Sequence, residues 1–221
     1  MDIFPTPIYH VPVPQMEQHH QDLLDLFNER IKSGKMKAGE YGHGYQTPPD
    51  LFQPNAYGPK RGYLAEILGA AFCDACEEIL YAQRNDSVAE FVWVNTMTWG
   101  WAHVQTAETL ATEPPWHTHL PAQLSGCYYV STATSVDEGN LQFLSPGTDT
   151  IFQPQSIEVV PRAGHMIIFP SYLKHKPTPS PTTTQTRIAL CMDSHWTVQG
   201  THQVPPEMLK NIPKGSEYGK R

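Results

Sequence analysis

The feature that most constrains the fold is a series of short segments, rich in β-branched and aromatic residues, between residues 90 and 193. Six such segments occur, at 90–99, 123–132, 140–144, 156–160, 165–169 and 187–193. Turn-forming sequences such as Ser145-Pro146-Gly147 lie between them. Short strands at this spacing are typical of sandwiches and double-sheet jelly rolls. We therefore predict a mainly β core made of two facing sheets.

The first ninety residues have a different character. Residues 4–14 are interrupted by prolines, which donate no backbone hydrogen bond, so this stretch can form only an edge strand or an extended arm. Apolar residues near helical spacing predict helices over 18–32 and about 62–83, with a long loop over 39–59 between them. We predict one domain over 1–221, with an arm and supporting helices at 1–89, the β core at 90–195 and a tail at 196–221.

Charge, apolar runs and cysteine content exclude several classes of protein. Fifteen basic and 22 acidic residues give a net charge of −7, which argues against a nucleic-acid-binding protein. No apolar run approaches the roughly 18 residues that a membrane span needs, and the start of the chain lacks the features of a signal peptide. Four cysteines are few for a chain of 221 residues, which predicts a reducing compartment, the cytoplasm. Cys73 and Cys76 form a CxxC inside the second helix, where packing is the expected role.

Three histidines are candidate metal ligands. His117 and His119 are two residues apart just before an apolar strand, so an extended chain would present both imidazoles on one side. Imidazole suits iron, zinc, copper and nickel, and a divalent ion needs a further ligand. The best candidate is His175, which follows the strand at 165–169 after a turn.

Arg187 opens the last predicted strand. A charge facing the interior needs a carboxylate partner, because a buried unpaired charge is very costly. No Asp or Glu of the chain is an obvious partner, and a bound organic acid could pair with the guanidinium in a bidentate way.

These motifs together resemble a known enzyme family. In order they are His117-Thr118-His119, the strand Leu124–Val130, Gly139–Phe143, the segment Pro161–Ser171, a distal histidine and Arg187-Ile188-Ala189-Leu190. The chain resembles the iron(II)/2-oxoglutarate-dependent oxygenases, and most closely the small bacterial and phage branch of that superfamily. The resemblance covers roughly residues 91 to 193.

The resemblance implies a double-stranded β-helix, a jelly roll of cupin-like form, with iron inside its mouth. His117 and His175 match the two histidines of the family's metal triad. Arg187 matches the base that grips the distal carboxylate of 2-oxoglutarate, and Tyr129 matches a tyrosine that helps to hold it. Parity along the strand would also turn Ser125 and Cys127 inward, and Ser125 is a further candidate contact of the co-substrate.

The chain departs from the family at His119, where the common pattern has an acid. His119 is predicted as the remaining metal ligand, which would make a triad of neutral imidazoles. Alternative ligands are Gln123 or an acid from a loop, Glu113 or Asp137. The tryptophans near this motif are candidates for the mouth of the site or for core packing: Trp99, Trp101 and Trp116.

Three functions remain open at this stage. The first is an iron(II)- and 2-oxoglutarate-dependent dioxygenase that uses O2 and releases succinate and CO2. The second is a three-histidine cupin that oxidises a small molecule without 2-oxoglutarate, and the third is a non-catalytic jelly-roll module. The substrate, a small molecule or a peptide, is not determined by fold. Self-association through the arm and helices also stays open.

Overall fold

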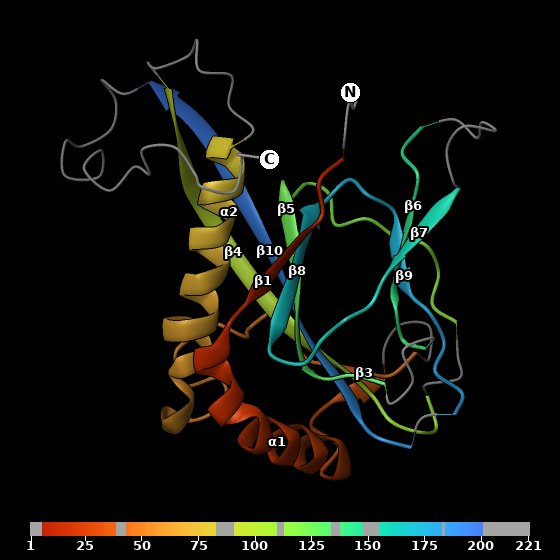
Figure 1. Cartoon of the computed structure of the whole chain (residues 1–221). Helices are drawn as coiled ribbons and strands as arrows, with labels where there is room; N and C mark the ends of the chain where they lie inside the picture. Colours follow the sequence, from red (N-terminus) through yellow and green to blue (C-terminus); the bar gives the residue numbers. More distant parts are fainter. Residues whose placement is uncertain are drawn as a thin grey trace.

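The chain forms a jelly roll of two antiparallel sheets flanked by helices (Figure 1). The computed structural model describes residues 6–38, 43–82, 91–109, 113–133, 138–147, 155–182 and 184–200. The seven-stranded major sheet has the order β1-β8-β5-β10-β4-β3-β2, and the three-stranded minor sheet has the order β7-β6-β9. The strands are β1 (Tyr9–Pro12), β2 (Lys37–Ala38), β3 (Tyr45–Gln46), β4 (Phe91–Gln105), β5 (Leu124–Ser131), β6 (Leu141–Leu144), β7 (Ser156–Val159), β8 (His165–Pro170), β9 (His175–Pro177) and β10 (Arg187–Gly200).

The helical elements precede the long strands. They are η1 (Pro14–His19), α1 (His20–Lys32), η2 (Pro59–Arg61), the π-helical turn η3 (Leu64–Gly69) and α2 (Ala70–Ala82). Both predicted helices are confirmed, although the second begins as a π-helix and continues as α2. No helix within the described ranges has both the length and the apolar character needed to cross a membrane.

All six predicted strands are present, and two are longer than expected. β4 continues to Gln105 and β10 to Gly200, because these two strands pair along almost their whole length. The predicted start of the tail at 196 is therefore wrong, since residues 196–200 belong to β10; residues 201–221 lie outside the described part of the chain. The prolines of the first stretch fit the edge strand β1, which pairs only with β8.

Three short strands were not predicted from sequence. β2 and β3 have two residues each; β3 lies in the segment interpreted as a long loop, and β2 lies just before it. β9 has the sequence His-Lys-Pro, which carries no strand signal of its own, and it exists because His175 pairs with Phe143 of β6.

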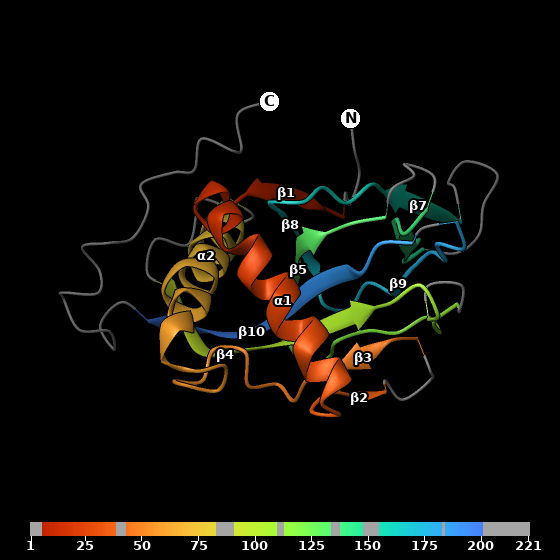
Figure 2. The ribbon, with the colours of Figure 1, turned by 90° about the horizontal axis from the view of Figure 1, so that it is seen from below.

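The major sheet has two buried faces, and residues of β5 and β10 alternate between them. Tyr128, Leu190 and Met192 point to the outer side, where α1 and α2 pack (Figure 2). Tyr129 and Ala189 point to the inner side, toward the minor sheet and its Phe143. The alternation has the period of two that a strand imposes, and it leaves the inner face free to build a site.

One glycine lets α2 approach the sheet. A Cβ added at Gly126 of β5 would lie 2.8 Å from the ring of Phe72 on α2. That distance is shorter than a normal carbon–carbon contact, so only glycine fits at this crossing without a shift of the helix or the ring. The close contact fixes the outer face of β5, and therefore also the direction of its inner residues.

Candidate functional site

The inner face of the major sheet is organised in rows of directly paired residues. Strand β10 lies between β5 and β4, so Ala189, Cys191 and Asp193 have a paired neighbour on both sides, and Arg187 has one on β4. The rows are Ser125–Asp193–Trp99, Cys127–Cys191–Trp101, Tyr129–Ala189–His103 and Arg187–Gln105. The site therefore runs along β10, with Asp193 at one end and Arg187 at the other.

The three predicted histidines lie together near the Asp193 end. His117 forms an isolated antiparallel bridge with His175, in which each backbone N–H donates to the other residue's carbonyl at 3.2 and 3.0 Å. The His119 N–H donates to the Ser171 carbonyl at 3.0 Å, which anchors the second residue of the motif. One potential ligand atom from each imidazole lies within 4.8 Å of the others. The sequence motif and the distal histidine therefore meet in one cluster.

In each of the three rings, Nδ1 makes a hydrogen bond to the protein. Nδ1 of His117 donates to the Pro115 carbonyl at 3.0 Å, and Nδ1 of His175 donates to the Leu173 carbonyl at 2.9 Å. Nδ1 of His119 lies 2.8 Å from a carboxylate oxygen of Asp193. An acceptor oxygen at each Nδ1 places the proton there, which leaves each Nε2 with a lone pair for a metal ion. The donor set fits a divalent first-row metal such as iron(II).

Burial favours the neutral form, which a metal requires, at two of the three imidazoles. Burial, together with the neighbouring His117 and His119, lowers the pKa of His175 to about 3. Burial also lowers the pKa of His117, the most exposed of the three rings. Burial acts in the same direction at His119, but the hydrogen bond and charge of Asp193 outweigh it and raise the pKa of that ring.

Asp193 places a negative charge next to the histidine cluster, because its carboxylate contacts His119. Its carboxylate is almost fully buried and bonds both His119 and the Ser125 hydroxyl, the latter at 2.6 Å. Ser125 in turn lies 2.8 Å from the Ser171 hydroxyl. The buried carboxylate therefore polarises His119 through its Nδ1–H.

The Ser125 hydroxyl belongs to this network, and its contact with the co-substrate stays a prediction. Ser125 faces inward, as parity predicted, but its side chain is fully buried against Asp193 and Ser171 and does not line the cavity. It pairs directly with Asp193, at the end of the site where the histidines lie.

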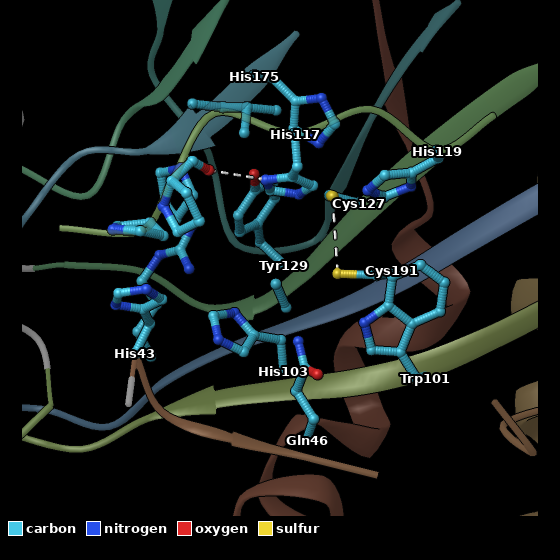
Figure 3. A pocket seen from close by; sticks show the side chains of 16 residues that line it. His43, Gln46, Trp101, His103, His117, His119, Cys127, Tyr129, His175 and Cys191 are labelled. Atoms are coloured by element: carbon cyan, nitrogen blue, oxygen red, sulfur yellow. Dashed lines mark hydrogen bonds between the residues drawn. The ribbon is translucent and has the colours of Figure 1, made fainter. Parts of the chain in front are cut away.

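A cavity of about 350 Å³ opens from the histidine cluster along the inner face (Figure 3). Its floor includes Cys127, Cys191 and Ala189, and its far end is formed by Tyr129 and Arg187. His43, Gln46, Trp101 and His103 line the remaining wall.

Two buried polar atoms at the far end lack a partner. Arg187 donates to the Gln105 side chain at 2.8 Å, but its Nε makes no hydrogen bond. The Tyr129 hydroxyl also has none, and the guanidinium lies over that ring at 5.2 Å. Within the described part of the chain no carboxylate forms an ion pair with Arg187. A buried cation and an adjacent hydroxyl without partners fit an anionic ligand.

The alternative metal ligands are engaged elsewhere. The Gln123 side chain accepts a hydrogen bond from the Trp196 backbone at 2.7 Å. Glu113 is exposed and pairs with Lys176, and Asp137 lies outside the described residues. Among the tryptophans, Trp101 lines the cavity, whereas Trp99 and Trp116 do not.

Sequence reasoning missed two features of the site. Asp193 was not recognised, although its parity with Arg187, Ala189 and Cys191 along the last strand was a usable signal. The pairing of Cys127 with Cys191 was also missed, because strand register cannot be read from composition.

Comparison with known proteins adds an independent line of evidence. Residues 100–193 match the family model described as "Putative 2OG-Fe(II) oxygenase". A search of curated protein sequences found no significant match. The matched residues include the three histidines, Asp193 and Arg187.

Several solved structures share the fold. The chain is similar to a prolyl-4-hydroxylase from Pseudomonas putida, with 12% identity, a TM-score of 0.57, and coverage of 86% of this chain and 92% of that one. It is similar to a prolyl hydroxylase from Trichoplax adhaerens solved with a hypoxia inducible factor peptide fragment, with 11% identity, a TM-score of 0.58, and coverage of 85% and 83%. It is also similar to the epimerase SnoN, solved with Fe3+, alpha ketoglutarate and nogalamycin RO, with 14% identity, a TM-score of 0.57, and coverage of 98% and 89%.

Proposed function

We propose that the chain is a 2OG-Fe(II) oxygenase, an enzyme that uses iron(II), 2-oxoglutarate and O2, and that it hydroxylates an organic substrate with release of succinate and CO2. His117, His119 and His175 hold the iron through their three Nε2 atoms. Bound iron supplies the activation of O2 and the redox chemistry of the reaction. The remaining work falls to the residues of this chain.

Arg187 and Tyr129 bind the distal carboxylate of 2-oxoglutarate. The two terminal nitrogens of the guanidinium donate to the Gln105 side chain and to the Gly139 carbonyl, so its Nε and the Tyr129 hydroxyl are the donors left for the acid. Their burial makes the interaction strong, because an ionic hydrogen bond gains strength where water is excluded. Gln105 keeps the guanidinium in place before the acid arrives.

Ala189 leaves room between the two ends of the site. It lies between Tyr129 and His103 in the sheet, and its small side chain lines the cavity floor. This floor would hold the carbon chain of the co-substrate between Arg187 and the histidines. Trp101 and the neighbouring strands exclude water from the reacting end.

One observation carries the proposal: a single cavity joins three metal-directed Nε2 atoms to an unpartnered buried guanidinium. Neither end of the cavity is needed to build the other. A metal centre alone does not require Arg187, and an anion site alone does not require three aligned imidazoles.

The test is anaerobic addition of iron(II) and 2-oxoglutarate to the metal-free protein, followed by visible absorption. We expect a metal-to-ligand charge-transfer band, which requires both to bind at one centre. Arg187→Ala should abolish the band and retain iron binding, whereas Arg162→Ala, at an exposed position, should leave both unchanged. Iron uptake without a band would favour the three-histidine cupin, and failure to take up iron would favour the non-catalytic module.

The cavity wall formed by β3 and β4, beside the floor, bears on the choice of substrate. Gln46, Trp101 and His103 offer an amide, an indole and an imidazole there, and among the described residues no carboxylate or ammonium lines this part of the cavity. We infer that the reacting part of the substrate is uncharged, whether it belongs to a small molecule or to a peptide. Succinate release measured across a panel of neutral metabolites and peptides tests this, and selective turnover of polyanions would contradict it.

The redox state of the cysteines is relevant to the cellular compartment of the protein. All four are free thiols, which supports the proposal that the protein works in the reducing cytoplasm.

A further inference from the structure

Two cysteines face each other in the floor of the cavity. Cys127 of β5 and Cys191 of β10 are directly opposite in the antiparallel register. Their sulfur atoms are 3.9 Å apart in a thiol–thiol hydrogen bond, drawn as a dashed line in Figure 3. Both side chains line the cavity, so a small reagent in the cavity reaches both sulfurs.

The backbone already has the spacing that a disulfide requires. Directly opposed residues of an antiparallel pair have Cα atoms about 4.5 or 5.5 Å apart, and both values lie within the range found for disulfides. Forming the bond requires the sulfurs to approach from 3.9 Å to about 2.0 Å, which side-chain rotation and a small strand adjustment can provide. We propose that Cys127 and Cys191 are a reversible redox pair that peroxide entering the cavity converts to a disulfide.

The reaction balances with hydrogen peroxide as the oxidant. One thiol, as its thiolate, attacks a peroxide oxygen; the O–O bond breaks and a sulfenic acid and hydroxide form. The second sulfur then attacks the sulfenic sulfur, the S–O bond breaks, and water leaves as the disulfide forms. In total two thiols lose two electrons and two protons, and one peroxide becomes two molecules of water.

The other two cysteines differ from this pair in position. Cys73 and Cys76 lie on one helix, where Cys73 contacts the Thr98 hydroxyl and Cys76 contacts that of Ser194. Neither lines the cavity. Of the four thiols, only Cys127 and Cys191 combine opposed backbone positions with a shared opening to small reagents.

Peptide mapping of the peroxide-treated protein tests the proposal. The full-length, metal-free protein is treated with stoichiometric hydrogen peroxide, digested without reductant and analysed by mass spectrometry. We expect a cross-linked peptide joining Cys127 to Cys191, with loss of two hydrogen atoms from the intact mass and full reversal by dithiothreitol. Separate sulfinic acids at these positions, or cross-links confined to Cys73 and Cys76, would overturn the proposal.

Single variants provide the matched controls. Cys127→Ala and Cys191→Ala each leave a cysteine that cannot resolve its sulfenic acid, so we expect irreversible sulfinic acid at the survivor. Cys73→Ser should leave the cross-link unchanged. If the cavity variants fold poorly, the wild-type peptide map still decides the matter.

The position of the pair predicts a second effect, which rests on the proposed function. The Cys127–Cys191 row lies between the row of Asp193 and the row of Tyr129, so 2-oxoglutarate that spans the site covers both sulfurs. With redox-inert zinc in place of iron, 2-oxoglutarate should slow disulfide formation several-fold. If calorimetry shows the acid bound and the rate does not change, this placement of the pair is wrong. If the acid does not bind, the proposed function fails and the metal-free result is unaffected.

Discussion

The imidazole of His119 and the carboxylate of Asp193 form a buried pair with an Nδ1–oxygen distance of 2.8 Å. The pair supplies negative charge behind an imidazole of the candidate metal site. His119 therefore binds a cation more strongly than an isolated imidazole would.

We expect Asp193→Asn to weaken metal binding by about 10- to 100-fold, the range seen when such an outer partner is lost. The amide keeps the shape but removes the charge that polarises His119. Calorimetric titration with zinc or anaerobic iron(II) measures the change. The exposed Asp25→Asn on α1 is the control; equal affinities for the Asp193 variant and the wild type would show that the pair only supports packing.

Tyr129→Phe should weaken 2-oxoglutarate binding by roughly 3- to 10-fold, the value of one net hydrogen bond of about 0.5–1.5 kcal/mol. The hydroxyl has no partner in the protein, so its removal leaves no internal group unpaired. Titration of the charge-transfer band gives the affinity. Metal affinity should be unchanged, and a loss of both would mean that the ring supports the metal site instead.

The stability of the metal-free protein should fall as the pH drops from 6.5 toward 3. The pKa of His175 is lowered from 6.5 to about 3 by burial and by the neighbouring histidines. Between these values the unfolded chain binds a proton that the folded chain does not, so the free energy of unfolding rises with pH. One such group contributes at most about 1.4 kcal/mol per pH unit.

Urea unfolding in the presence of a chelator, repeated across this pH range, measures the slope. His175→Gln removes the group and should make the profile flatter. An unchanged slope in the variant would assign the acid sensitivity to other residues.

Gly126→Val should destabilise the fold by about 1–3 kcal/mol, the usual cost of overpacking. Even a first side-chain carbon meets the Phe72 ring at 2.8 Å. Thermal unfolding measures the loss, and combining the change with Phe72→Leu should restore part of it. Additive losses in the double variant would contradict a direct clash.

The parts of the molecule that sequence predicted are those fixed by local chemistry. The strands of the core follow from β-branched and aromatic residues, and the edge character of β1 follows from proline. The His117-x-His119 spacing placed two imidazoles together because alternate residues of an extended chain share a side. The distal partner His175 came from order along the chain and from the family resemblance.

The parts that sequence did not predict depend on pairing between distant strands. Asp193 meets His119, and Cys191 meets Cys127, only when β10 adopts its register beside β5. The contact of Ser125 with the co-substrate stays a prediction, because parity fixes the face of a residue but not its depth along the strand. β9 exists only through its partner β6.

Both edge strands of the major sheet are short, which affects how copies of the chain can associate. One edge is β1, which has four residues and ends at a proline, and the other is β2, which has two residues and begins with an exposed lysine. Short strands, proline and lysine all discourage the addition of a foreign strand. Copies of this chain would therefore associate through side-chain surfaces rather than by extending the sheet from one molecule into the next. A truncated variant without β1 would expose the backbone of β8 and acquire the tendency to polymerise that the native edge prevents.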